Sequence, residues 1–377
     1  MYNFSFFYGK IFLIEMGDTV KRYTKEELIG QKLLVGIKDK EITSGVEKLI
    51  QKYKVGGFIL YRDNYDTYEE MITMIKKLKE LNRVNRIPLL ICVDQENGVV
   101  NRLPEEFHRI KNALASSICD EDTIKEIGDI TSEILYRSGV NMNFAPTLEI
   151  YNENISSSIG NRCFGKDSDT VIRNTKIIMN ASINNKVIPV IKHFPGLGKI
   201  KIDTHLFLPT LNRISKEDIK PFIELIKEKA PCILLGHVVV KSKSKKPASL
   251  SKKMNTELRD KYKFKGITIT DDLKMRSVRY RYGRLKAAVY ALKAGNDIIM
   301  FNYPYKSELR VIKEYYELYK KYEDDIKKSA KKIIKLKEEY EINDNDFIEL
   351  TDKEIKDYNK RIDKVNKKIL KLNNIEM

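Results

Sequence analysis

The chain has 377 residues, 42% of them hydrophobic, which is enough for one large domain with a sizeable core and excludes an intrinsically disordered protein. The formal net charge is +17, but the lysines are spread along the chain and mixed with Asp and Glu. Because the charges are mixed in this way, we expect no Arg-rich clusters interleaved with aromatic residues. We therefore predict a solvated basic surface and no nucleic-acid partner.

The N-terminus and the cysteines both bear on the cellular compartment. The first sixteen residues are apolar and aromatic, but Lys10 interrupts the run, and no basic stretch or small-residue cleavage site marks a signal peptide. The run is too short to span a bilayer, so no stable membrane insertion is expected, and Met16 is an alternative start. The four cysteines show no metal-binding or disulfide spacing, which favours a cytoplasmic protein without zinc.

Eight short apolar runs recur along the chain, and amphipathic segments lie between them. Near-continuous Val, Ile and Leu runs are typical of strands buried on both faces. Eight strands alternating with helices predict an α/β protein with a single (β/α)8 TIM-like barrel, and a doubly wound sheet is the alternative. The expected strands are Leu33–Gly36, Val55–Tyr61, Pro88–Asp94, Val140–Pro146, Val187–His193, Cys232–Val238, Gly266–Asp271 and Asp297–Phe301. The expected helices include Tyr68–Asn82, Glu121–Ser138, Asp169–Asn184, Lys216–Lys229 and Gly283–Ala294.

Ionisable residues end several of these runs. Asp94, Lys192-His193, His237 and Asp271-Asp272 all lie at or near the carboxyl end of an expected strand. An unpaired buried charge is costly, so packing alone does not explain this recurrence. Because barrel enzymes build their active sites at this face, we expect a site there.

The segment after the fifth run has the composition of an active-site loop. A turn rich in Pro and Gly, 195–198, separates Lys192-His193 from Asp203-Thr204-His205. A carboxylate two residues before a histidine can accept a hydrogen bond from the imidazole and fix its tautomer. An ordinary polar surface loop with two histidines is the alternative.

The composition changes beyond Tyr305, where Lys, Glu, Tyr and Ile dominate. Residues Ser307–Lys337 are expected to form one or two helices that complete the outer layer of the barrel. The amphipathic stretch Ile342–Met377 packs on the barrel, binds a partner or frays, and packing is favoured. We divide the chain into an N-terminal extension (1–22), a catalytic domain (23–340) and a charged helical tail (341–377).

Seven segments, in order and in spacing, match one known family. They are GQKLLVG (30–36), VGGFILYRDN (55–64), VDQENGVVNRL (93–103), NMNFAPTLEI (141–150), IGNRCFG (159–165), KHFPGLGKIKIDTHLFLP (192–209) and PASLSKK…GITITDDLKM (247–275). The third resembles VDxEGGRVxRL and the sixth resembles KHFPGHGxTxxDSHxxLP. Together they resemble the glycoside hydrolase family 3 β-N-acetylglucosaminidases over roughly Ile29–Phe301.

The resemblance implies a role for each matching residue. Asp271 would be the nucleophile, and Asp272 beside it would be structural. His205, oriented by Asp203, would be the acid/base group. The residues that would hold the sugar are Asp94, Arg102, Arg162, Lys192 and His193. No metal and no organic cofactor is implied, and we expect Glu96 and His237 to orient neighbours rather than to act on substrate.

The implied activity is removal of terminal β-linked GlcNAc from cell-wall fragments, as in peptidoglycan recycling, with a small carbohydrate or muropeptide as substrate. A retaining glycosidase normally uses two carboxyl groups, and here a histidine that titrates near neutrality would replace one of them. Two rivals stay open. One is a β-N-acetylglucosaminide phosphorylase of the same family, and the other is a non-catalytic amino-sugar-binding protein. The sequence predicts no oligomeric state.

Four positions depart from the family pattern. Leu197 and Ile200 stand where the family usually has His and Thr, in and just after the Gly-rich turn. Asn97 replaces the first glycine of EGG, and Val99 replaces the arginine after the second. Because the expected catalytic residues and Arg102 are intact, we expect an active enzyme, with the loop conformation and the substrate range left open.

Overall fold

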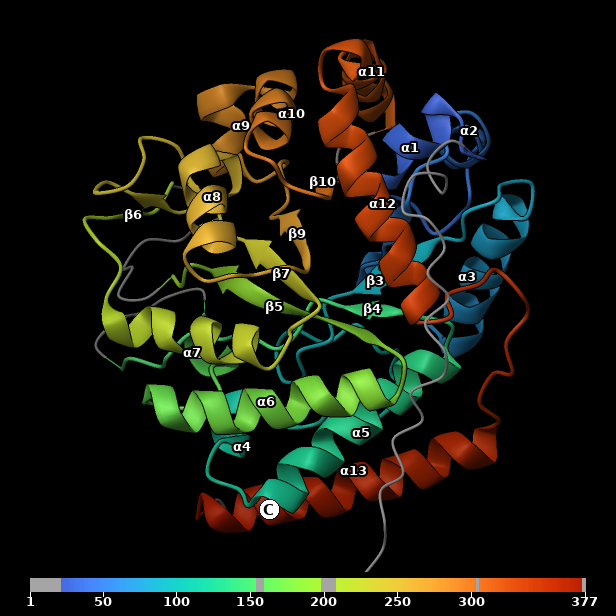
Figure 1. Cartoon of the computed structure of the whole chain (residues 1–377). Coiled ribbons are helices and arrows are strands. Elements are labelled where there is room, and N and C mark those ends of the chain that lie inside the picture. Colours follow the sequence, from blue (N-terminus) through green and yellow to red (C-terminus); the bar gives the residue numbers. More distant parts are fainter. Residues whose placement is uncertain (1–21, 154–158, 198–207, 303–304, 375–377) are drawn as a thin grey trace, which may run out of the picture.

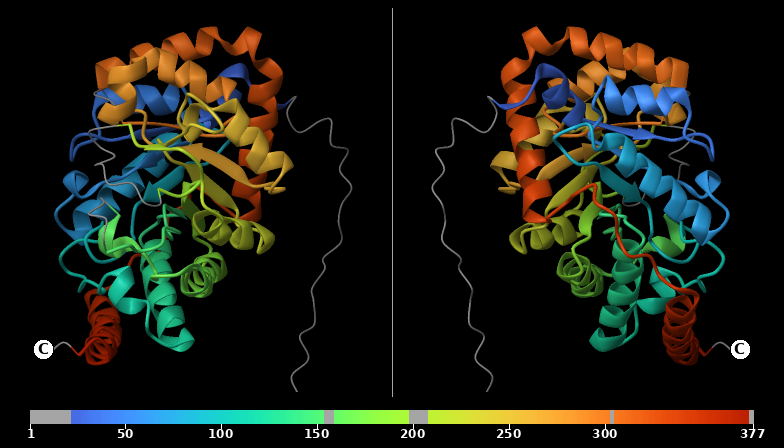
Figure 2. Two further views of the ribbon diagram at one scale, coloured as in Figure 1. Left: turned by 90° about the vertical axis from the view of Figure 1, so that its left-hand side faces the viewer. Right: turned by 90° about the vertical axis from the view of Figure 1, so that its right-hand side faces the viewer.

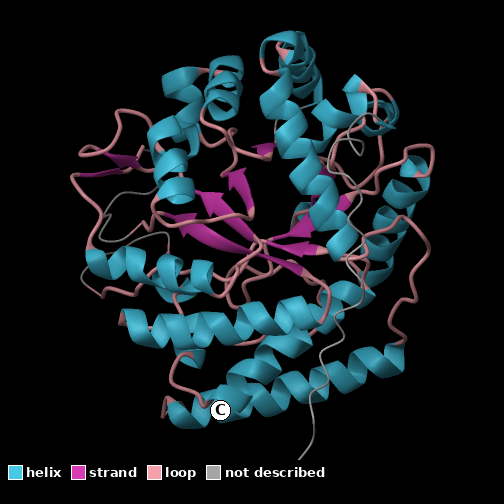
Figure 3. Ribbon diagram, in the orientation of Figure 1, coloured by secondary structure: helices cyan, strands magenta, loops and turns pink. Residues whose placement is uncertain are grey.

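A parallel eight-stranded barrel forms the centre of the molecule (Figures 1 and 3). The computed structural model describes residues 22–153, 159–197, 208–302 and 305–374. The strands are β1 (Leu33–Gly36), β2 (Gly57–Ile59), β3 (Leu90–Val93), β4 (Met142–Asn143), β5 (Ile188–Phe194), β7 (Cys232–Leu235), β9 (Ile267–Thr270) and β10 (Ile299–Phe301). They pair in the order β10-β1-β2-β3-β4-β5-β7-β9, and a parallel bridge between Ile269 and Ile298 joins the two ends. The predicted barrel with its eight strands is therefore confirmed, and the doubly wound sheet is excluded.

The alternation of side chains along each strand separates two apolar layers. In β1, Leu34 points into the barrel, whereas Leu33 and Val35 pack against the surrounding helices. Cys92 and Cys232, on β3 and β7, are fully buried in the barrel interior, as expected for small core residues. Most strand residues are apolar, and polar ones such as Asn143 and Thr270 are buried and accept hydrogen bonds from backbone N–H groups.

Helices surround the barrel, as the two side views show (Figure 2). They are α1 (Lys25–Gln31), α2 (Ser44–Gln51), α3 (Tyr68–Asn82), α4 (Ala113–Ser116), α5 (Glu121–Arg137), α6 (Ser168–Asn184), α7 (Lys216–Lys227), α8 (Lys252–Asp260), α9 (Arg276–Tyr282) and α10 (Arg284–Lys293). The long ones begin where the sequence supplies a cap. Thr67, Asp120, Asp167 and Ser215 each accept a hydrogen bond from a backbone N–H in the first turn of α3, α5, α6 and α7.

A second, two-stranded sheet was not predicted. Its strands, β6 (Thr210–Leu211) and β8 (Val239–Val240), are parallel and too short to carry a sequence signal. β6 follows β5 in the chain, and β8 follows β7. The small sheet therefore ties together two of the segments that leave the carboxyl end of the barrel (Figure 1).

The C-terminal region packs on the barrel. α11 (Tyr305–Glu317) and α12 (Glu323–Glu339) complete the outer layer, and Ile333 and Leu336 of α12 join the apolar interior of the barrel. The buried ammonium of Lys337 donates to the carbonyl oxygens of Gly56 and Pro88, at 2.9 and 2.6 Å, just before β2 and β3 begin. α12 thus closes the amino-terminal end of the barrel.

The last helix, α13 (Asp352–Leu372), lies along α5 and α4 (Figure 1). Its apolar face is buried through Ile355, Ile362, Val365 and Ile369. Arg361 forms ion pairs with Glu126 and Glu133 of α5, at 2.8 and 2.6 Å. Packing, the option that the sequence favoured, is what the structure shows. Among the described residues, no helix has both the length and the apolar character that a membrane crossing demands.

Candidate active site

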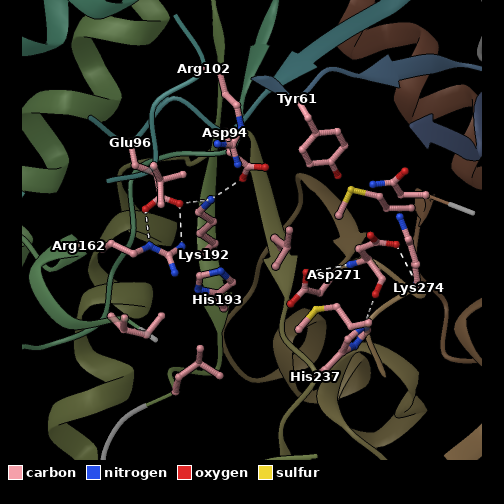
Figure 4. Close-up of a pocket in the computed structure, with 18 of the residues that line it drawn as sticks. Tyr61, Asp94, Glu96, Arg102, Arg162, Lys192, His193, His237, Asp271 and Lys274 are labelled. Atoms are coloured by element: carbon pink, nitrogen blue, oxygen red, sulfur yellow. Dashed lines mark hydrogen bonds and ion pairs between the residues drawn. The ribbon is translucent and has the colours of Figure 1, made fainter. Parts of the chain in front are cut away.

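A cavity of about 540 Å³ opens at the carboxyl end of the barrel, and Figure 4 shows the side chains that line it. The lining residues that the sequence analysis proposed for the site are Asp94, Arg102, Arg162, Lys192, His193 and Asp271. The remaining two, Asp203 and His205, lie outside the described residues. The structure therefore brings together residues from five strand ends and loops, which span 178 positions of the chain, from 94 to 271.

Three charged residues form an ion-pair network around the buried Glu96. Lys192, on β5 and only 2% exposed, places its Nζ 2.5 Å from Glu96 Oε1 and 2.7 Å from Asp94 Oδ1. Arg162 donates from Nε to Glu96 Oε2 and from Nη2 to Oε1, both at 2.7 Å (Figure 4). A bidentate arginine–carboxylate pair fixes both partners in one geometry. The network thus joins the loop after β3, strand β5 and the turn at Gly160–Arg162.

Glu96 keeps its negative charge in this position. Burial alone would raise the pKa of this carboxyl, but the positive charges of Lys192 and Arg162 outweigh it and hold the pKa well below its usual range. Glu96 therefore orients its neighbours, as the sequence suggested. Asp94 has a more open position, with its side chain 20% exposed at the cavity.

Arg102 is held at the cavity wall by its backbone. Its N–H donates to Gln95 Oε1 at 2.6 Å, and its carbonyl oxygen accepts from the Tyr65 hydroxyl at 3.0 Å. The guanidinium lies 5.7 Å from the centre of the Tyr61 ring. The buried Nε finds no hydrogen-bond partner in the part of the chain that the structure describes. A buried donor without a partner is costly, so this atom fits a bound acceptor.

His193 is positioned by a carboxylate that the sequence analysis did not single out. Glu149 Oε1 accepts from the His193 backbone N–H at 2.9 Å and lies 3.2 Å from His193 Nδ1. Glu149 is buried, and its other oxygen, Oε2, has no hydrogen-bond partner within the described ranges. Its position in the NFAPTLEI segment after β4 was the signal available in the sequence.

Asp271 and Asp272 follow β9 directly. The Asp271 backbone N–H still pairs with Leu235 on β7, at 3.0 Å, and its Oδ1 accepts from the Asp272 N–H at 2.8 Å. Desolvation raises the pKa of Asp272 to about 7, and the charge of Asp271 acts in the same direction. Asp272 Oδ1 accepts from the Lys274 N–H at 2.8 Å, so this residue shapes the turn rather than competing with Asp271.

His237 lines the cavity, but both of its ring nitrogens have protein partners. Nδ1 lies 2.7 Å from Ser249 Oγ and Nε2 lies 2.9 Å from the Asp272 carbonyl oxygen. Burial lowers the pKa of this imidazole, although the nearby Asp271 opposes the shift. His237 therefore holds the Asp271-Asp272 turn in place, which agrees with the supporting role expected from the sequence.

The departures from the family pattern have different structural consequences. Asn97, which replaces a glycine, has a φ of +69°, and Asn is among the few residues that adopt this region readily. Its side chain bonds to Gln95 and Thr131, so the turn is preserved. Leu197 is buried and lines the cavity, whereas Val99 is 70% exposed. Ile200 lies outside the described residues.

Sequence reasoning assigned no role to several other lining residues, although Tyr61 and Lys274 lie within the matching segments. They include Tyr61, Lys274, Arg276 and Asn302. Within the described ranges, no group of three or more His, Cys, Asp or Glu side chains is arranged to hold a metal ion. The chemistry of the cavity that can be described is that of carboxylates, cationic donors and an imidazole.

Comparison with known proteins shows to which family the chain belongs. The model of the glycosyl hydrolase family 3 N-terminal domain matches residues 24–336. The chain belongs to glycoside hydrolase family 3. The β-hexosaminidases of Tolumonas auensis and Idiomarina loihiensis are 31% and 30% identical to it, over 71% of this chain and 81% and 82% of theirs. A family 3 β-N-acetylglucosaminidase from Paenibacillus sp. str. FPU-7 has a similar structure, with a TM-score of 0.83 at 26% identity, over 91% of this chain and 68% of that one.

Membership of glycoside hydrolase family 3 confirms the resemblance found in the seven segments. The expectations of a TIM-like barrel and of a glycoside hydrolase are confirmed with it. Family membership does not assign roles to individual residues, so those roles are argued from the geometry of the cavity.

Replacing Glu96 tests whether the ion-pair network stabilises the site. In Glu96→Gln, the buried Lys192 and Arg162 lose the charge that they share, so the free energy of unfolding should fall by about 3 kcal/mol. Urea unfolding followed by circular dichroism measures the change. The matched control is Asp169→Asn, which removes an exposed partner of Lys220 and should leave the unfolding midpoint where it is. Equal behaviour of the two variants would contradict the assignment.

The raised pKa of Asp272 predicts that the stability of the protein depends on pH. Between its ordinary pKa of 3.8 and the folded-state value of about 7, the folded protein binds one more proton than the unfolded chain. Stability conferred by this group is therefore lost as the pH rises through that window. The free energy of unfolding of Asp272→Asn, relative to that of the wild type, should therefore rise by about 2 kcal/mol between pH 5 and pH 8.

Urea titrations of both proteins at the two pH values measure this difference. The exposed Asp260→Asn serves as control, because its advantage should not depend on pH. A constant difference between Asp272→Asn and the wild type would show that the carboxyl is already ionised at pH 5.

Proposed function

We propose that the protein is a retaining exo-β-N-acetylglucosaminidase that removes terminal β-linked GlcNAc through a covalent glycosyl–Asp271 intermediate. The observation that carries the proposal is the placement of Asp271 at the end of β9, in the same cavity as the Lys192–Asp94–Glu96–Arg162 network. A nucleophile and a set of fixed polar groups that share one cavity are what glycoside cleavage demands. The relatives named β-hexosaminidase support the choice of sugar.

The terminal sugar is held by the groups on the β3 and β5 side of the cavity. The partly exposed carboxylate of Asp94 accepts from sugar hydroxyls, and its ion pair with Lys192 orients it. Arg102 Nε, which lacks a protein partner among the described residues, donates to a sugar oxygen. Arg162 and His193 complete the contacts to the hydroxyls and the N-acetyl group. Because Asp94, Lys192 and Arg162 are already fixed by ion pairs, little ordering of these side chains is left for the moment of binding.

In the first chemical step, an Asp271 carboxylate oxygen forms a bond to C1 of GlcNAc while the bond from C1 to the aglycone oxygen breaks. The imidazolium of His205 gives its proton to the departing oxygen, and Asp203 stabilises that imidazolium. In the second step, His205 takes a proton from water as the water oxygen bonds to C1 and Asp271 leaves. Two inversions at C1 give net retention.

The substrates that fit this assignment are cell-wall-derived glycosides, including muropeptides, handled in the cytoplasm. We place the activity in the domain formed by residues 23–340, and the tail, 341–377, supports it by packing α13 along α5 and α4. A bound partner for the tail is not needed to explain its apolar face, since that face is buried.

The nucleophile is tested with Asp271→Ala and a chromogenic β-N-acetylglucosaminide, in buffers with and without phosphate. Loss of the attacking oxygen should lower kcat by at least about 1000-fold. Asp260→Ala, an exposed acid on α8, should match the wild type. Free GlcNAc as the product in both buffers supports the hydrolase. GlcNAc-1-phosphate in the phosphate buffer would make the protein a phosphorylase, and GlcNAc binding without turnover would make it a binding protein.

The acid/base role of His205 is tested by the leaving group. In His205→Ala, kcat/KM should fall by about 100-fold for a natural disaccharide, because its departing oxygen needs a proton. A dinitrophenyl glycoside leaves readily without protonation, so its loss should be much smaller. His108→Ala, which alters an exposed histidine, is the control. Equal losses on both substrates would exclude His205 as the acid.

A further inference from the structure

One stretch of the chain departs from the even mixture of charges that the composition suggested. Residues 273–296 contain seven Lys and Arg residues and no Asp or Glu. Within it, 276–284 reads RSVRYRYGR, an Arg-rich cluster interleaved with tyrosines. The expectation that such clusters are absent is therefore wrong at this place. The stretch begins directly after the Asp271-Asp272 pair.

The structure places the first two cationic residues of this stretch on the wall of the active-site cavity. Lys274 and Arg276 line the cavity and are exposed, and the Lys274 backbone N–H donates to Asp272 Oδ1 (Figure 4). Arg279 and Arg281 follow on α9, where Arg281 is exposed and Arg279 is half-buried. We call Lys274, Arg276, Arg279 and Arg281 the cationic rim.

The rim carries positive charge that the protein does not neutralise. None of its four residues forms an ion pair with a carboxylate in the described part of the chain. Two other cationic residues that line the cavity behave differently, since Lys192 pairs with Asp94 and Glu96, and Arg162 pairs with Glu96. Arg279 and Arg281 instead lie 5.2 and 5.9 Å from the ring centres of Tyr280 and Tyr282.

The deeper wall of the cavity has no such excess of positive charge. Arg102, Arg162 and Lys192 are balanced there by Asp94, Glu96, Asp271 and Asp272. A neutral GlcNAc residue is served by these groups and gains nothing from the rim. The rim is therefore matched to the part of the substrate that extends beyond the terminal sugar.

We propose that the cationic rim is a subsite for an aglycone that carries carboxylate or phosphate groups. The proposal rests on the glycosidase function and names the substrate class for it. Guanidinium groups bind both anions through paired N–H donors, and an exposed cluster of one sign also attracts a charged substrate from a distance. Each exposed contact is weak, so the four groups act through their sum.

The test compares substrates that differ only in charge. One pair is GlcNAc-β-1,4-linked to N-acetylmuramic acid, with its lactyl carboxylate free or methyl-esterified. The second pair is GlcNAc β-linked to glycerol phosphate or to glycerol. For the wild type in 50 mM salt, kcat/KM should be about tenfold higher for the charged member of at least one pair. The pair that shows the preference identifies carboxylate or phosphate as the natural anion.

Two further measurements assign the preference to the rim. In Arg276→Gln/Arg279→Gln/Arg281→Gln, the ratio of the two kcat/KM values should fall to about two or less. The matched control, Lys356→Gln/Lys364→Gln/Lys367→Gln, removes three exposed charges from α13 and should keep the wild-type ratio. Because the triple variant can fail to fold, the wild type is also assayed in 0.5 M salt, where screening should remove most of the preference.

Four outcomes would overturn the proposal. If the wild type cleaves both members of each pair equally, the rim selects no anion, although the glycosidase function stands. If the ratio survives in a folded rim variant and in high salt, another group recognises the charge. If a single-stranded RNA binds tightly through the rim and no charged substrate is preferred, the rim is a nucleic-acid surface. Failure to cleave any substrate, including a neutral chromogenic glycoside, rejects the glycosidase function and this subsite with it.

Discussion

The buried carboxylate of Glu96 is the constraint on which the cavity depends. A charge of this kind survives in a protein interior only when opposite charges and hydrogen bonds surround it. Lys192 supplies one from β5, Arg162 supplies another from the turn at Gly160–Arg162, and Thr147 adds a hydroxyl at 3.2 Å. Three separate segments are thereby held to the loop after β3. The same Lys192 ammonium fixes Asp94, so the demand to neutralise one carboxylate also orients a second one that faces the cavity.

The barrel makes this arrangement possible by segregating apolar and polar layers. Its interior is filled by alternate strand residues such as Leu34, Cys92 and Leu234, and α12 covers the amino-terminal end with Ile333 and the buried Lys337. The charged groups that line the cavity are concentrated at the opposite end. There the strands stop, the backbone diverges, and side chains from β3, β5 and β9 reach a common space.

Charge is also divided within the site. The deep groups are paired with each other, so their positions are set before a substrate arrives and their net charge is small. The residues after β9 are different, because Lys274 and the arginines of α9 have no acidic partners among the described residues. Paired charges hold side chains in position, whereas unpaired charges attract groups of opposite charge. On the proposed function, this division assigns the terminal sugar to the paired groups and the group attached to it to the cationic rim.

Local sequence determined most of the secondary structure. Apolar runs such as Val187–His193 become strands, and caps such as Thr67 and Asp120 start helices at the expected residues, because both signals act over a few positions. The seven segments were also enough to assign the family and to nominate the residues around the cavity. The short β6–β8 sheet escaped prediction because two-residue strands carry no periodicity. Glu149 escaped because its segment marks its place after a strand but not its contact with His193, which is 44 residues away.

Only the tertiary structure decided which charges are paired. Glu96, Arg162 and Lys192 are scattered over 97 positions, from 96 to 192, and their contact is a consequence of barrel closure. The same holds for the unpaired state of the rim. A basic stretch in a sequence carries no net charge in the folded protein if acidic residues from other segments pack against it. Sequence fixes which groups exist and where strands end. The fold decides which of them share a low-dielectric space, and that proximity sets their pKa values, their orientation and their availability to a ligand.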